Sequence, residues 1–147
     1  MNISIKEISK DNINIVKSMR VKPEQETFIE TVEECLEEAS LYKEWHPVAI
    51  YYNGNIVGFA MYGCFGPNRH TWIDRILIDG RYQGMGIGKA AMTKLIDIVL
   101  REYQVDTIYL SLVKENNIAK KLYKSIGFQD MNEIDPNNGE LMFKYKL

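Results

Sequence analysis

Residues 81–89 have the sequence RYQGMGIGK, which is the most informative stretch of the chain. It follows an apolar, β-type run at residues 70–78 and precedes a long segment whose apolar residues recur at helical spacing. Glycines at the alternate positions 84, 86 and 88 let backbone N–H groups approach an anion without obstruction by a Cβ atom. The start of the following helix adds positive potential at the same place. The stretch therefore predicts a strand–loop–helix unit that binds a pyrophosphate.

Three other interpretations of this loop differ in the residues that they require. A purely structural turn also uses glycine. A P-loop requires glycine at position 83 and Ser or Thr at position 90, but these positions hold Gln83 and Ala90. The letters of a dinucleotide fingerprint are present in Gly86-x-Gly88-x-x-Ala91, although that fingerprint belongs in the first βα turn of a fold and here several predicted strands come earlier. The dinucleotide loop remains the second choice.

Working outward from the loop, the sequence predicts an α/β (α+β) fold. Its central sheet is mixed and mostly antiparallel, with six to seven strands and helices on both faces. Asn53-Gly54 suits a type I′ hairpin turn, and Asn116 or Asn117 can cap a helix that Gly127 ends. Strands are expected near residues 3–5 and at 48–52, 55–64, 70–78, 107–113, 128–131 and 140–147. Helices are expected around 13–19, at 23–40, from the glycine loop to about 103, and from the cap at 116 or 117 to 126.

Composition excludes several classes of protein. The 147 residues are 46% hydrophobic and 26% charged, with 18 basic and 20 acidic side chains and a formal net charge of −2. This balance argues against a protein that binds nucleic acid through its phosphates. Two cysteines imply no disulfide framework, His46 and His70 have no ligands at metal-binding spacing, and no apolar run is long enough for a signal or a membrane span. We therefore expect a cytoplasmic protein with no metal, nucleic acid or membrane partner.

The loop resembles the acyl-coenzyme A loop of the GNAT N-acetyltransferase superfamily. That family's pattern, Arg/Gln-x-x-Gly-x-Gly/Ala, is met twice, from Arg81 and from Gln83, and the later motif Asn116-x-x-Ala119-x-x-x-Tyr123 also looks like the family. The resemblance covers nearly the whole chain and implies one N-acetyltransferase domain with the GNAT fold over residues 1–147. Within the superfamily, VGFAMYG at 57–63 and WIDR at 72–75 look like bacterial spermine/spermidine (diamine) acetyltransferases.

The resemblance implies acetyl-CoA as co-substrate. The backbone of residues 76–78 would bond the pantetheine arm, and the loop amides would hold the pyrophosphate. Tyr123 would lie near the thioester sulfur. The residues expected to bind acetyl-CoA are Ile76, Leu77, Ile78, Gln83, Gly84, Met85, Gly86, Ile87, Gly88, Lys89 and Asn116.

Two side chains are the candidate catalytic residues. The Tyr123 phenol can donate a proton to the departing thiolate, although its spacing also suits a core aromatic on a helix. Asp74 interrupts an apolar strand and would bind the amine or relay its proton, although a salt bridge to Arg75 is equally open. A bulge near Leu77 or Ile78 is expected to free a backbone N–H for the oxyanion.

Residues 23–40 contain seven glutamates and no Lys or Arg. As one helix, with a capping box at Thr27 and Glu30, they would form a stripe of like charges that a polycation would relieve. Glu33 and Glu37 on this stripe are the expected substrate-binding residues. The alternative is a solvated face kept for solubility.

The sequence thus predicts transfer of an acetyl group to a small polyamine, such as spermidine, spermine or a diamine, by direct attack in a ternary complex. Another acceptor remains open: a protein lysine or N-terminus, an aminoglycoside, or an amino acid. A different class is a non-catalytic module that only binds acyl-CoA. A homodimer through the C-terminal hairpin is a further expectation.

Overall fold

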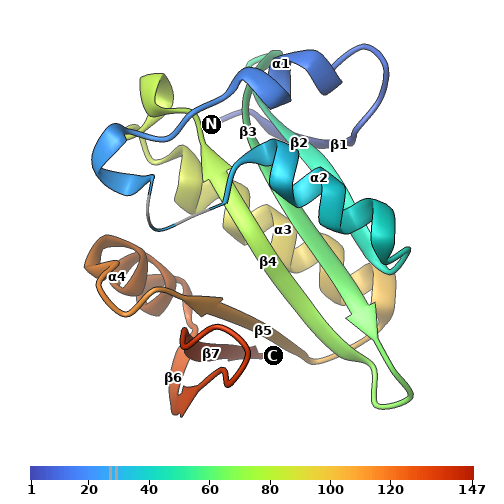
Figure 1. The fold of residues 1–147 in the computed structure, drawn as a ribbon, viewed down its shortest axis with the longest axis vertical. Helices are drawn as coiled ribbons and strands as arrows, with labels where there is room; N and C mark the ends of the chain where they lie inside the picture. Colours follow the sequence, from blue (N-terminus) through green and yellow to red (C-terminus); the bar gives the residue numbers. More distant parts are fainter. Residues whose placement is uncertain (27, 29) are drawn as a thin grey trace.

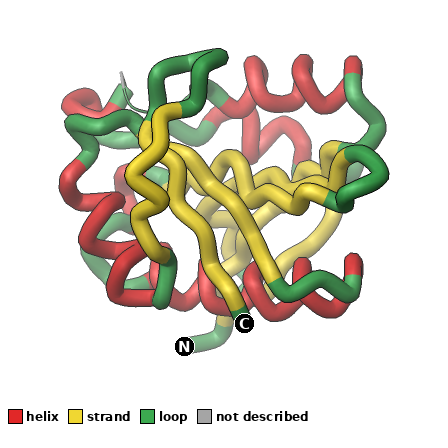
Figure 2. The backbone as a smooth tube through the Cα atoms, turned by 90° about the horizontal axis from the view of Figure 1, so that it is seen from below, coloured by secondary structure: helices red, strands yellow, loops and turns green. Residues whose placement is uncertain are grey.

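The computed structural model describes residues 1–26, 28 and 30–147. A seven-stranded sheet in the order β1-β2-β3-β4-β5-β7-β6 lies between two layers of helices (Figures 1 and 2). Neighbouring strands pair antiparallel except β4 and β5, which are parallel. The predicted fold class is therefore confirmed. The strands are β1 (Ile3–Glu7), β2 (Trp45–Tyr52), β3 (Asn55–Phe65), β4 (His70–Ile78), β5 (Thr107–Leu112), β6 (Gln129–Ile134) and β7 (Leu141–Lys146).

Helices cover both faces of the sheet because successive strand side chains point to opposite sides. In β2, Val48 and Ile50 join the core beneath α3 (Ile87–Tyr103) and α4 (Asn117–Ile126), whereas Ala49 between them packs with α1 (Ile13–Ser18) and α2 (Val32–Leu41). Two short 3₁₀ turns are η1 (Pro23–Gln25) and η2 (Gly80–Tyr82). None of the helices in the described ranges has the length and apolar character needed to cross a membrane.

The turn and cap residues act as predicted. Asn53 and Gly54 both have positive φ, 49° and 83°, as a type I′ turn between β2 and β3 requires. Asn116 caps α4 by accepting the Ala119 N–H at 3.2 Å, and Gly127 ends the helix at φ 124°. These short-range patterns are correct because each depends on residues that are neighbours in the chain.

The predicted helix at 23–40 is wrong in its first half. Residues 23–25 form η1, and α2 begins at Val32 after a capping box in which Thr31 and Glu34 bond each other's backbone N–H groups. The predicted cap at Thr27 and Glu30 cannot be compared, because Thr27 lies outside the described residues. Starting at Thr31 turns Val32 and Cys35 inward against the sheet, and both are buried.

The expected bulge lies elsewhere on β4. Leu77 and Ile78 pair regularly with β3, and the irregularity leaves Asp74 as the extra residue opposite Met61 and Tyr62. Along the described part of the chain, β4 and β5 share register only at Trp72 and Tyr109. The two strands then diverge (Figure 1), so the later half of β4 is left without a strand partner on that edge.

Candidate functional site

The glycine loop has the geometry of an anion cradle. Gly84 and Gly86 adopt φ 80° and 79°, which L side chains rarely tolerate, and Gly86 is the N-cap of α3. No atom lies within 4 Å of a Cβ built on Gly84. The Gln83 side chain holds the loop by donating to the Ile78 carbonyl at 2.9 Å and to Gln25 Oε1 at 2.8 Å.

A cavity of about 640 Å³, here called the loop cavity, lies between this loop, the free end of β4 and the start of α4. It is lined by every predicted acetyl-CoA-binding residue except Met85, which is 48% exposed outside it. Its lining comprises residues 21, 22, 24, 25, 28, 76–78, 82–84, 86–89, 115–119, 122 and 123. The open glycine backbone, the helix N-terminus and Lys89 fit a bound pyrophosphate.

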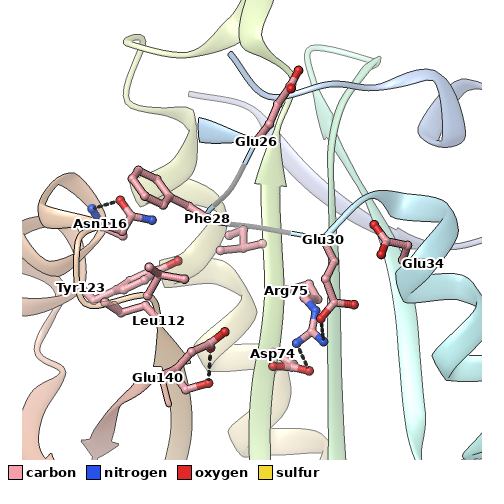
Figure 3. Close-up of a pocket in the computed structure, with 14 residues that line it drawn as sticks. Glu26, Phe28, Glu30, Glu34, Asp74, Arg75, Leu112, Asn116, Tyr123 and Glu140 are labelled. Atoms are coloured by element: carbon pink, nitrogen blue, oxygen red, sulfur yellow. Dashed lines mark hydrogen bonds and ion pairs between the residues drawn. The ribbon is translucent and has the colours of Figure 1, made fainter. Parts of the chain in front are cut away.

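Tyr123 lies where the loop cavity meets a second pocket. Its ring packs edge-on against Phe128, with centroids 5.8 Å apart, and its hydroxyl points towards β4 (Figure 3). Burial raises the pKa of the Tyr123 phenol, so the group keeps its proton at neutral pH. Tyr123 is thus a core aromatic whose polar end faces a cavity, and its role as proton donor stays a prediction.

The second pocket, here called the acidic pocket, has a volume of about 330 Å³. Five carboxylates line it, and they come from three separate regions of the chain (Figure 3). They are Glu26, Glu30, Glu34, Asp74 and Glu140. Because one cationic side chain, Arg75, lines the pocket with them, the pocket favours a positively charged ligand.

Asp74 lines the acidic pocket at the bulge of β4, and its side chain is 13% exposed. Burial raises the pKa of Asp74 to about 6, and Glu38 and Glu30 add to this effect while Arg75 opposes it. Asp74 also forms an ion pair with Arg75, which is the alternative the sequence left open. Arg75 in addition bonds Glu30 at 2.6 Å and Glu38 at 3.1 Å, and so ties β4 to α2 and the segment before it.

Glu33 and Glu37, the glutamates singled out from the sequence, do not line the described pockets. Both are exposed on α2, because the helix begins at Val32 after its cap at Thr31 and so turns Val32 and Cys35 inward. Glu140 was missed for a different reason. It lies more than 100 positions from Glu26, Glu30 and Glu34, immediately before β7, and it reaches the pocket by accepting a 2.8 Å hydrogen bond from Ser111. No local pattern marks such a residue.

The site therefore joins an anion cradle to an acidic pocket, with a protonated phenol between them. This arrangement suits transfer of a group from an anionic donor to a cationic acceptor. The model of the acetyltransferase (GNAT) family matches residues 15–128. The chain is 39% identical over 150 residues, covering 98% of this chain and 99% of the relative, to a spermine/spermidine N(1)-acetyltransferase of Bacillus subtilis (strain 168).

Solved structures share the fold at much lower identity. The spermidine N-acetyltransferase of Vibrio cholerae, in complex with CoA and spermine, superimposes with a TM-score of 0.75 at 14% identity, over 97% of this chain and 92% of that one. An aminoglycoside acetyltransferase in complex with coenzyme A superimposes with a TM-score of 0.79 at 14% identity, over 99% of this chain and 95% of that one. Motifs, cavity, family model and full-length relative all agree, and this chain belongs to the acetyltransferase (GNAT) family.

Proposed function

We propose that this protein is an acetyl-CoA-dependent N-acetyltransferase that acetylates a primary amine of a polyamine such as spermidine or spermine, in the cytoplasm. The observation that carries this proposal is the position of Tyr123, which lines both the loop cavity and the acidic pocket. The name of the Bacillus subtilis relative, similar over its whole length, supports the choice of acceptor. A homodimer stays a prediction.

On the donor side, acetyl-CoA supplies a thioester carbonyl and a thiolate leaving group. The amides of residues 84–89 and the Lys89 ammonium would hold the pyrophosphate at the start of α3. The unpaired edge of β4 at residues 76–78 would bond the pantetheine arm, and a backbone N–H on that open edge, such as that of Ile78, would stabilise the oxyanion. Asn116, at the N-cap of α4, lines the same cavity.

On the acceptor side, the carboxylates of the acidic pocket would bind the ammonium groups. A primary ammonium has a pKa of about 10.4, so one proton must leave before the nitrogen can attack. Asp74, ionised at neutral pH, would receive this proton directly or through water. As the new C–N bond forms and the C–S bond breaks, the nitrogen would lose its second proton to solvent and Tyr123 would donate its proton to the sulfur. Solvent would then restore the phenol proton.

Thiol release from acetyl-CoA tests the proposal. The panel contains spermidine, spermine, short diamines, an aminoglycoside and a lysine peptide. We expect the highest kcat/KM with spermidine or spermine. No thiol release with any amine would refute the enzyme, and a higher kcat/KM with the aminoglycoside or the peptide would refute the polyamine acceptor.

A further inference from the structure

A third cavity, here called the aromatic pocket, opens beside the acidic pocket and has no role in the chemistry above. Its volume is about 330 Å³. Its walls come from α2, β2, β3, β4, β5 and the turn between β6 and β7. The lining residues are Glu38, Trp45, Phe65, Trp72, Asp74, Arg75, Ser111, Asp135, Asn137 and Asn138.

Three aromatic rings give this pocket its character. Trp45 and Phe65 pack edge to face with centroids 4.6 Å apart, and Trp72 lies 5.7 Å from Tyr109. Each of the three lining rings is only partly buried, so part of its surface is open to the pocket. Aromatic faces attract alkylammonium groups, and their apolar surface also accepts methylene chains.

Besides Asp74, two carboxylates line the pocket and supply counter-charge. Asp135 uses Oδ1 to accept the Asn137 N–H at 2.9 Å, which fixes the carboxylate on the β6–β7 turn. Glu38 reaches the pocket from α2. The pocket is also lined by Arg75, but its guanidinium is already paired with Asp74, Glu30 and Glu38 and is 16% exposed. A cation in the pocket therefore meets rings and carboxylates rather than a free positive charge.

The three cavities adjoin one another in series, because neighbouring cavities share lining residues. The aromatic pocket shares Asp74, Arg75 and Ser111 with the acidic pocket, and the acidic pocket shares Tyr123 with the loop cavity. A linear molecule with its reacting amine at Tyr123 would cross the acidic pocket, pass Asp74 and reach the rings. A monoamine would leave the last pocket empty.

We propose that the aromatic pocket binds the distal ammonium of a linear polyamine whose other end is acetylated beside Tyr123. This inference rests on the proposed function and deepens it. The enzyme would select acceptors by length and by the charge at their far end, with Trp72 and Asp135 as the specificity-determining residues. Short monoamines would react without this contribution.

Steady-state kinetics with spermine and n-butylamine test this site. Asp135→Asn keeps the oxygen that accepts from Asn137 and removes the charge, and Trp72→Leu removes the ring but keeps an apolar side chain. We expect each variant to lower kcat/KM for spermine about 3- to 10-fold and to change kcat/KM for n-butylamine less than 2-fold. The matched control is Glu133→Gln, an exposed carboxylate on the same hairpin that lines none of the three cavities.

The outcomes separate the two proposals. If the wild-type protein releases thiol with neither amine, the proposed function fails. If it acetylates both amines with equal kcat/KM, or if the variants lose spermine and n-butylamine activity in equal proportion or not at all, the distal site is refuted while the acetyltransferase stands. Loss confined to spermine supports the site.

Discussion

At the scale of single residues, Asp74 shows how one side chain combines two roles that the sequence presented as alternatives. It forms an ion pair with Arg75 and it also faces the acidic pocket. The bulge at this position leaves Asp74 without a direct partner on β3, and burial raises its pKa to about 6. Burial disfavours the ionised form of this carboxylate in the folded protein. The stability of the protein therefore depends on pH in the range where Asp74 titrates.

Asp74→Asn is expected to change the pH dependence of stability. Between about pH 4 and pH 6 the folded protein binds more protons at Asp74 than the unfolded chain, so the free energy of unfolding falls as pH rises through this window. The variant lacks this loss. The free energy of unfolding of the variant, relative to that of wild type, should therefore rise by up to roughly 3 kcal/mol between pH 4 and pH 7. Urea unfolding at the two pH values measures the gain, with Asp97→Asn on the exposed face of α3 as control. If variant and wild type differed by the same free energy of unfolding at both pH values, the raised pKa of Asp74 would be contradicted.

Tyr123→Phe separates proton donation from packing, because phenylalanine keeps the ring that contacts Phe128. If the phenol is the general acid, kcat should fall about 10²-fold while the affinity for acetyl-CoA stays within about 2-fold. Steady-state kinetics and titration calorimetry measure the two quantities. Tyr145→Phe is the matched control, since Tyr145 also packs on Phe128 but lines none of the three cavities. An unchanged kcat would remove Tyr123 from the mechanism.

At the scale of elements, α2 connects local capping to the acceptor site. Thr31 and Glu34 form the capping box, and Thr31 hydrogen bonds hold the pKa of Glu34 below its usual value. Glu34 also lines the acidic pocket, and Glu38 on the next turn lines the aromatic pocket. The first turn of this helix therefore sets both its stability and the position of two acceptor-side carboxylates.

Thr31→Ala removes the hydroxyl that accepts the Glu34 N–H at 3.2 Å. We expect a loss of about 1 kcal/mol in the free energy of unfolding and a higher KM for spermidine, with KM for acetyl-CoA unchanged. Urea denaturation and initial rates measure these effects. Thr31→Ser should restore both values, and Thr93→Ala, which removes an exposed hydroxyl from α3, should leave KM unaltered. If KM for spermidine were unchanged in Thr31→Ala, α2 would not position the acceptor.

At the scale of the whole molecule, a net charge of −2 hides an uneven distribution. Carboxylates from the segment before α2, from α2, from β4 and from the residue before β7 converge on the acidic pocket. Lys89 lines the loop cavity, whereas Arg81 is paired with Asp79 at 2.9 Å and does not line that cavity. The tertiary fold thus divides the surface into a side for a cationic acceptor and a side for an anionic donor.

Ionic strength should therefore affect acceptors according to their charge. Because salt screens the pocket carboxylates, KM for spermine should rise several-fold between 50 and 300 mM NaCl, roughly as expected from Debye screening, while KM for n-butylamine changes little. Glu26→Gln, which removes one exposed carboxylate of the acidic pocket, should flatten the response to spermine. Equal salt slopes for the two amines would show that the pocket charges do not attract the acceptor.

Short-range features of this protein were determined by its sequence alone. Four such features are present in the structure: the Asn53-Gly54 turn, the Asn116 cap, the glycine loop, and the alternation of β2 side chains between the two faces of the sheet. Each depends on residues a few positions apart. The start of α2 was ambiguous even at this range. Thr27 with Glu30 and Thr31 with Glu34 have the same capping spacing, and local sequence does not choose between them.

Only the tertiary structure decided the composition of the pockets. Glu140 meets Asp74 because β7 and β4 lie on either side of β5. The aromatic pocket exists because α2, four strands and the β6–β7 turn converge. Tertiary packing also brings Glu30 and Glu38 to Arg75, in addition to its chain neighbour Asp74. Helix and strand patterns in a sequence reflect contacts between residues that are close along the chain. A pocket is instead defined by packing between distant segments, and in this protein also by the divergence of β4 from β5.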